Sequence, residues 1–215
     1  MVERLRYRLE IGDGAGSCFR NQRYRVVESR HWAVGISVRG WSVSSSNAAT
    51  PFTPPSKISI DLLHYDSIVA AVTGANGVFH LASPNIIDQV HDPEKELLDP
   101  AIKGTNSVLT AAKELGVRRV AVTSSISAIT PSRYWPADVV KDENCWADID
   151  YCKTKGLWYP LSKTLAEKAA WEFAKEKGLD VVVVNPGTVL GPILPPALNA
   201  SMLVILRLLQ GIAQI

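Results

Sequence analysis

Short apolar runs alternate with amphipathic stretches from about residue 56 to the end of the chain. The runs lie at residues 57–62, 77–82, 117–123 and 180–185, and turn-forming residues bound them. Runs of this kind, rich in β-branched residues, are typical of strands that are buried on both faces of a parallel sheet. We therefore predict four parallel strands at these positions.

The stretches between these runs repeat their apolar positions every three or four residues, as amphipathic helices do. They cover residues 65–72, 94–115 and 161–177. Gly178 follows the last stretch directly, where a glycine commonly ends a helix. The alternation of strands and helices predicts an α/β fold in which helices cover both faces of a parallel, doubly wound sheet.

The first 55 residues show no sustained apolar period, and Trp41 to Pro55 is a Ser-, Asn-, Thr- and Pro-rich run typical of loops. The use of cations also changes near residue 60. Residues 1–60 hold eight Arg, one Lys and four acids, whereas residues 61–215 hold four Arg, ten Lys and 17 acids. We interpret residues 1–55 as an unrelated, poorly ordered leader. An organelle transit peptide is an alternative, although the four acids count against it.

Composition narrows the class of protein. The chain has 215 residues, of which 47% are hydrophobic and 20% charged, as in ordinary globular domains. Its net charge of +2 is too small to suggest a nucleic-acid partner. Prolines interrupt the most apolar region, Val181 to Leu209, which argues against a membrane span. Three cysteines and no recognisable signal peptide predict a soluble, cytoplasmic protein.

Small and hydroxyl residues follow three of the four predicted strands. Ligands of doubly wound sheets bind at the carboxyl ends of the strands, where small residues let a flat ligand approach the backbone. The residues concerned are Ala82 and Ser83, Thr123 to Ser125, and Pro186 to Thr188. We predict a ligand site at this edge.

Tyr159 and Lys163 are four residues apart and so share one face of a helix. A neighbouring ammonium favours the phenolate and lowers the pKa of a tyrosine, which could then donate a proton to a carbonyl oxygen as hydride reaches the carbon. Pro160 fits only in the first turn of that helix. Tyr151 and Lys155 form a second such pair, but they lie in the polar stretch 142–156, which we predict to be a loop.

Six segments resemble, in order and spacing, the plant cinnamoyl-CoA reductase and dihydroflavonol reductase group of the extended short-chain dehydrogenases/reductases. They are DLLHYDSIVAAV, GVFHLASP, VRRVAVTSSI, DENCWADIDYCK, WYPLSKTLAEKAAWEFAKEKG and VVVVNPGTVLGP. The resemblance implies an NADP-dependent oxidoreductase, which uses NADPH to reduce the aldehyde, ketone or thioester carbonyl of a small aromatic substrate.

The resemblance also implies roles for particular residues. Tyr159 would be the acid/base, Lys163 would bind the nicotinamide ribose and tune Tyr159, and Ser125 would position the substrate carbonyl. The implied cofactor contacts are Asp61 and Leu62 beside the adenine, Leu81, Ala82 and Ser83 along the cofactor, and Pro186, Gly187, Val189 and Ser201 toward the nicotinamide. Cys145 and Cys152 match paired family cysteines, either as a redox-sensitive bridge or as two free thiols.

The family's first strand, glycine-rich turn and helix have no clear counterpart here. Gly12, Gly14 and Gly16 imitate the spacing of the turn, but a charged segment precedes them and no amphipathic helix follows. We therefore expect residues 56–215 to form a partial NAD(P)-binding domain, an incomplete Rossmann-like sheet truncated at both ends with an exposed edge. A catalytically inactive remnant unable to bind the dinucleotide is the alternative hypothesis, and a sugar-nucleotide epimerase or dehydratase is a third.

Overall fold

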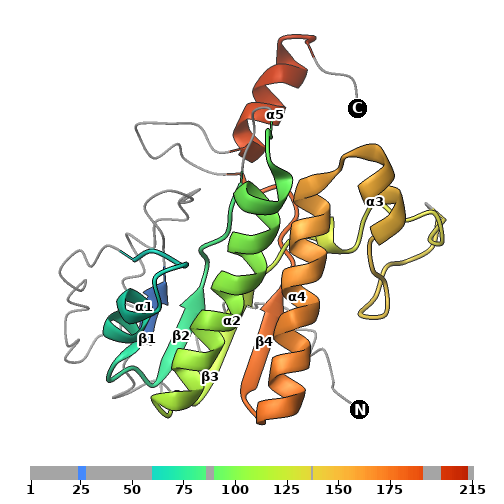
Figure 1. The fold of residues 1–215 in the computed structure, drawn as a ribbon. Helices are drawn as coiled ribbons and strands as arrows, with labels where there is room; N and C mark the ends of the chain where they lie inside the picture. The colour runs from blue at the N-terminus through green and yellow to red at the C-terminus, as the bar shows by residue number, and fades with distance from the viewer. Residues whose placement is uncertain (1–23, 28–59, 86–89, 137, 191–199, 213–215) are drawn as a thin grey trace, which may run out of the picture.

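One parallel sheet organises the part of the chain that the computed structural model describes, residues 24–27, 60–85, 90–136, 138–190 and 200–212. Its strands lie side by side in chain order (Figure 1). They are β1 (Tyr24–Val27), β2 (Gly77–His80), β3 (Arg119–Thr123) and β4 (Asp180–Val184). Strands β2, β3 and β4 confirm three of the four predicted strands, because buried β-branched runs give a strong local signal.

Strand β1 is a departure from the prediction, because it lies inside the segment interpreted as a leader. It pairs in parallel with β2, so that Tyr24 lies opposite Gly77 and Val27 opposite His80. This edge of β2 is therefore paired, where the sequence predicted an exposed edge. A four-residue strand is too short to show a period, and only its partner in space identifies it. Gly12, Gly14 and Gly16 lie outside the described residues.

The run at 57–62 lies partly outside the described residues and is not a full strand in the rest. Ile60 makes an isolated bridge, and a turn begins at the next residue. In that turn the carboxylate of Asp61 accepts a hydrogen bond from the backbone N–H of Leu63, at 2.9 Å. Short polar side chains of this kind commonly stabilise turns, which explains why the strand does not continue.

The three predicted helices are confirmed. They are α1 (Tyr65–Val72), α2 (Asp99–Glu114), which a π-helical turn η1 (Glu94–Leu98) precedes, and α4 (Trp158–Lys177). Gly178 ends α4 in the left-handed conformation, with a φ of 61°, which glycine adopts without the steric cost of a Cβ.

The stretch predicted as a loop at 142–156 contains a helix, α3 (Ile149–Lys155). Its N-cap is Asp148, whose carboxylate accepts a hydrogen bond from the backbone N–H of Tyr151 at 2.9 Å. The same carboxylate pairs with the Arg133 guanidinium at 2.7 Å. The loop prediction was wrong because a cap and a long-range ion pair stabilise α3, and its sequence has no apolar period.

Helices α1, α2 and α4 form one layer on one face of the sheet, with α2 in the middle (Figure 1). The core lies between this layer and the strands, with Val72, Val108, Leu109 and Val120 fully buried in it. The sequence predicted helices on both faces of the sheet, and the described residues show this layer on one of them. The one further helix of at least ten residues among the described residues is α5 (Ala200–Leu209), which lies beyond the carboxyl ends of the strands (Figure 1).

Helix α2 approaches the turn after Ile60 very closely. A Cβ placed on Gly104 would lie 2.9 Å from the Cβ of Leu62, a separation that leaves no room for a side chain. Leu62 is 2% exposed and packs into the core, whereas its neighbour Leu63 is 58% exposed.

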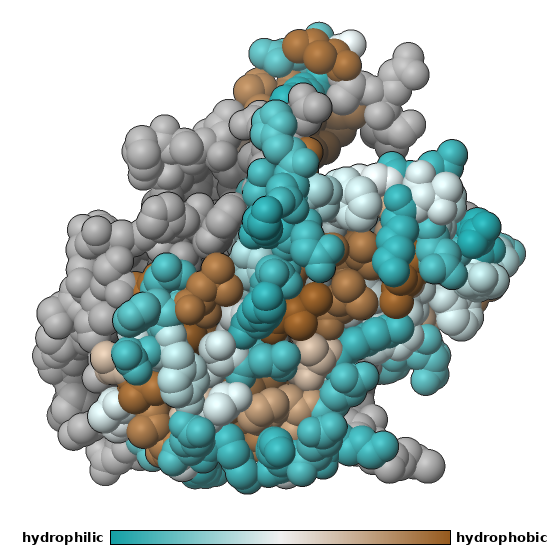
Figure 2. All heavy atoms as spheres, in the orientation of Figure 1, coloured by the Kyte–Doolittle hydropathy of each residue, from teal (hydrophilic) through white to brown (hydrophobic). Residues whose placement is uncertain are grey.

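Figure 2 shows apolar side chains between the helices of this layer and on α5. On α5 the exposed apolar residues include Val204 and Leu209. Within the described ranges, no helix is both long and apolar enough to cross a membrane.

Candidate active site

The amino end of α4 lies beside the carboxyl ends of β2 and β3. The helix starts at Trp158, so Pro160 falls in its first turn, where the missing N–H costs little. Because Pro160 lies in the first turn, Tyr159 can adopt the helical conformation. Tyr159 and Lys163 therefore lie one turn apart on α4, as their spacing predicted.

The structure brings Ser125, Tyr159 and Lys163 together. Ser125 follows β3 and caps a short 3₁₀ helix, η2 (Ile126–Ala128), by accepting a hydrogen bond from the backbone N–H of Ser127 at 3.1 Å. The Ser125 side chain lies beside the Tyr159 hydroxyl and lowers its pKa as a hydrogen-bond partner. The Lys163 Nζ atom lies 5.8 Å from the centre of the Tyr159 ring. A serine hydroxyl, a phenol and an ammonium thus share one site.

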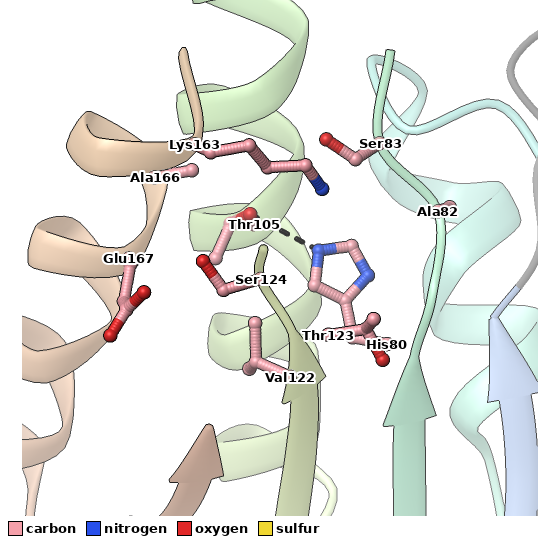
Figure 3. Close-up of a pocket in the computed structure, with 10 residues that line it drawn as sticks. All are labelled: His80, Ala82, Ser83, Thr105, Val122, Thr123, Ser124, Lys163, Ala166 and Glu167. Atoms are coloured by element: carbon pink, nitrogen blue, oxygen red, sulfur yellow. Dashed lines mark hydrogen bonds between the residues drawn. The ribbon is translucent and has the colours of Figure 1, made fainter. Parts of the chain in front are cut away.

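A pocket lies next to this group, at the ends of β2 and β3. The side chain of Lys163 extends from α4 across it, toward Ser83 and the ring of His80 (Figure 3). The pocket is lined by His80, Ala82, Ser83, Thr105, Val122, Thr123, Ser124, Lys163, Ala166 and Glu167. Ala82 and Ser83, predicted as cofactor contacts, are therefore in the same pocket as Lys163.

Burial controls the electrostatics of Lys163. Its side chain is 6% exposed, and the loss of solvation lowers its pKa to about 8, against the opposing effect of the Glu167 carboxylate one turn further along α4. A buried ammonium is costly unless a negative charge compensates it. With a pKa of about 8, Lys163 is mostly charged at pH 7.

The structure does not show the lowered pKa of Tyr159 that was expected from a neighbouring Lys163. Burial raises the pKa of the Tyr159 phenol, and the hydrogen bond from Ser125 opposes this only in part. The prediction of a lowered pKa was wrong, because sequence spacing says nothing about desolvation. Tyr159 is consequently a protonated phenol at neutral pH, which is the form that can donate a proton.

His80 lies on the floor of the pocket and is neutral. Burial, followed by the charge of Lys163, lowers its pKa to about 3. Its Nε2 atom lies 3.1 Å from the hydroxyl of Thr105. Its Nδ1 atom and the hydroxyl of Ser124 are buried and have no hydrogen-bond partner among the described residues. Such orphaned polar atoms beside a pocket are places where a ligand or water could bond.

The other predicted cofactor residues lie outside this pocket. Asp61 is exposed in its turn, and the side chain of Leu62 belongs to the core. The carbonyl of Pro186 accepts a hydrogen bond from the N–H of Ile126 at 2.9 Å. The hydroxyl of Ser201 accepts one from the N–H of Val189 at 3.1 Å. Leu81 is half-buried, and Gly187 is exposed.

Sequence reasoning missed three of the polar residues that line the pocket, one of which is His80 on β2. Thr105 lies on α2 and Glu167 on α4, both inside stretches that were predicted only as amphipathic helices. Glu167 follows Lys163 by four residues, so the signal was the same spacing that identified Tyr159. The thiols of Cys145 and Cys152 are both buried and free, and they do not form a bridge. No cluster of three potential metal ligands exists among the described residues.

Comparison with known proteins agrees with the resemblance found in the sequence. Cinnamoyl-CoA reductase 1 of Arabidopsis thaliana is 46% identical over 154 residues, which are 72% of this chain and 43% of that protein. Vestitone reductase from alfalfa superposes with a TM-score of 0.58 at 34% identity, covering 70% of this chain and 46% of that one. Yeast methylglyoxal/isovaleraldehyde reductase Gre2, complexed with NADPH, gives a TM-score of 0.61 at 29% identity, with 70% and 49% covered.

The chain spans a little under half the length of these relatives. The model of the 3-beta hydroxysteroid dehydrogenase/isomerase family matches residues 35–195, and its match therefore begins within the first 55 residues. Since this match extends over most of the sequence, the chain belongs to the 3-beta hydroxysteroid dehydrogenase/isomerase family, among the extended short-chain dehydrogenases/reductases.

Proposed function

We propose that this chain carries the active site of an NADPH-dependent reductase, which reduces the carbonyl of a small aromatic aldehyde, ketone or thioester. The observation that carries the proposal is the convergence of Ser125, Tyr159 and Lys163 beside a pocket at the carboxyl ends of the strands. The similarity to cinnamoyl-CoA reductase 1 and to the NADPH complex of Gre2 supports the same reaction class.

The residues around the pocket suit the nicotinamide half of such a cofactor. Lys163 presents a buried ammonium that a ribose hydroxyl could bond, and Ala82 and Ser83 are small enough for a flat group to lie near the backbone. In the part of the chain that the structure describes, nothing bonds the buried hydroxyl of Ser124. Gly12, Gly14 and Gly16, which imitate the spacing of the family's pyrophosphate-binding turn, lie outside the described residues. Bound NADPH would supply the hydride.

In this proposal the proton comes from Tyr159. Its phenol O–H bond breaks as the proton passes to the substrate oxygen, while the carbonyl carbon receives the hydride, so that an aldehyde or ketone gains both and becomes an alcohol. Ser125 donates a hydrogen bond to the same oxygen. The Lys163 ammonium stabilises the phenolate that remains on Tyr159. In a thioester the carbon–sulfur bond also breaks, and an aldehyde and a thiol leave.

A substrate panel tests the proposal directly. The purified chain is incubated with NADPH and an aromatic aldehyde, an aromatic ketone or an aromatic CoA thioester, and the loss of reduced nicotinamide is compared with product formation. We expect the chain to reduce at least one of these substrate classes, with one NADPH oxidised for each hydride transferred. No oxidation with any of them would favour the inactive-remnant hypothesis, and conversion of a sugar nucleotide would favour an epimerase.

The affinity for NADPH is expected to depend on pH through Lys163. Its pKa of about 8 means that the ammonium is present below pH 8 and is lost as the pH rises above it. A hydrogen bond from a charged group contributes about 1.5–3 kcal/mol, so affinity should fall by about ten- to a hundredfold between pH 7 and pH 10. Calorimetric titrations across this range measure the fall. In Lys163→Gln the affinity should be low and nearly independent of pH, and an equally steep fall in that variant would contradict the assignment.

A further inference from the structure

Glu167 is a buried acid in the wall of the pocket. It is 1% exposed and lies on α4, one turn beyond Lys163. Its carboxylate accepts hydrogen bonds from the side-chain amide of Asn185 at 2.7 Å and from the indole N–H of Trp171 at 3.3 Å. Buried carboxylates are costly unless donors and an opposite charge compensate them. A carboxylate held in this way is fixed in the wall of the pocket that Lys163 also lines.

Asn185 connects this carboxylate to the other side of the site. It follows β4, and its side-chain Nδ2 atom donates both to Glu167 and to the backbone carbonyl of Ser125, at 3.0 Å. The ends of β3 and β4 are also tied by the N–H of Ser124, which donates to the carbonyl of Val184 at 2.8 Å. One amide group therefore links helix α4 to the turn that carries Ser125.

Few titratable groups other than Glu167 lie around Lys163 in the described residues. The titratable groups that face Lys163 in the described residues are His80 on β2 and Tyr159 and Glu167 on α4. His80 is neutral because burial and the charge of Lys163 lower its pKa to about 3, and Tyr159 is a protonated phenol because burial raises its pKa. Among these groups, Glu167 is therefore the source of negative charge.

We propose that Glu167 and Asn185 form a positioning pair, in which Asn185 fixes the Glu167 carboxylate against the turn of Ser125 and Glu167 keeps the Lys163 ammonium charged inside the pocket. This inference rests on the proposed function, because a charged Lys163 is what the reaction needs to stabilise the phenolate of Tyr159. Neither residue contacts the reacting atoms. Both act through Lys163 and Ser125.

The test is a titration of Lys163 itself, which requires no cofactor. The 215-residue chain is prepared with ¹³C at the lysine Cε positions, and the NMR signal of Lys163 is identified by its loss in Lys163→Arg. Glu167→Gln keeps the shape of the side chain and an oxygen that can accept from Asn185, but it removes the charge. We expect the titration midpoint of Lys163 to fall by about one pH unit or more.

Asn185→Ala provides a second, independent variant. It removes the donor that fixes the Glu167 carboxylate against the turn of Ser125, so the carboxylate is free to move away from Lys163 and the Lys163 midpoint should again fall. Glu172→Gln is the matched control, because it removes an exposed acid from the same helix, and its midpoint should equal that of the wild type. Circular dichroism establishes whether each variant is folded. If Glu167→Gln does not fold, the Lys163 midpoint in Asn185→Ala tests the proposal.

An unchanged Lys163 midpoint in a folded Glu167→Gln or Asn185→Ala chain would overturn the proposal. A similar fall in Glu172→Gln would overturn it too, since any acid on the helix would then have the same effect. The result of this titration does not depend on whether the proposed function is correct. A chain that bound no NADPH would contradict the reductase assignment, yet the midpoint of Lys163 could still be read.

Discussion

Tyr159→Phe is expected to lower the rate of carbonyl reduction by about 100- to 10,000-fold, the usual contribution of a positioned acid. Phenylalanine keeps the ring beside Lys163 and removes only the hydroxyl, so it leaves no group to protonate the substrate oxygen. NADPH affinity should stay close to that of the wild type, because the proposed cofactor contacts belong to other residues. Single-turnover measurements of NADPH oxidation, with affinity measured separately, distinguish the two effects.

The chain contains its own control for this substitution. Tyr151 heads the second Tyr-x-x-x-Lys pair, but it lies on α3, where the Arg133 guanidinium is 5.7 Å from the centre of its ring. Unlike Tyr159, it is not on the helix that carries Lys163. Tyr151→Phe should therefore keep the wild-type rate of reduction. A loss of rate in Tyr151→Phe comparable to that in Tyr159→Phe, or a fully active Tyr159→Phe, would refute the role assigned to Tyr159.

Leu62→Ala is expected to lower the free energy of unfolding by about 2–5 kcal/mol, as for other large-to-small substitutions in a packed core. Leu62 is 2% exposed, and its Cβ faces the bare backbone of Gly104 on α2. Truncation leaves a cavity between α2 and the turn after Ile60, which the surrounding helices can fill only in part. Urea denaturation followed by circular dichroism measures the change.

The neighbouring residue tests whether this effect comes from packing. Leu63 has the same side chain but is 58% exposed, so Leu63→Ala should change the free energy of unfolding by less than about 0.5 kcal/mol. Equal losses in the two variants would mean that the turn, and not the burial of Leu62, determines stability here. The resemblance placed Leu62 beside the adenine. Because its side chain is in the core, only its backbone is left for such a contact.

The sequence predicted well those helices and strands in which the spacing of apolar residues itself indicates which face is buried. Helix α1 occupies the predicted residues 65–72, and β4 differs from its predicted range by one residue, because an apolar period survives in any tertiary setting. Strand β1 and helix α3 were missed for the opposite reason. A pairing with β2 defines the first, and an N-cap with an ion pair to Arg133 stabilises the second.

The same division holds within the site. The spacing of Tyr159 and Lys163 is local, so the sequence was sufficient to place them on one helical face. The link from Asn185 to Glu167 joins residues 18 positions apart, and no local pattern signals it. The pKa of Tyr159 was predicted in the wrong direction because it depends on burial by neighbouring elements, which a sequence read without its fold does not contain.

The central claim, that this chain carries a nicotinamide-dependent site, is tested most directly by calorimetric titration of the purified chain with NADPH. We predict binding in the micromolar range, weakened at least about tenfold in Lys163→Ala through loss of a charged hydrogen-bond donor. Glu172→Gln, which changes an exposed charge on the same helix, should bind as the wild type does. Absence of binding by the folded chain at millimolar NADPH, or equal binding by the wild type and Lys163→Ala, would contradict the claim.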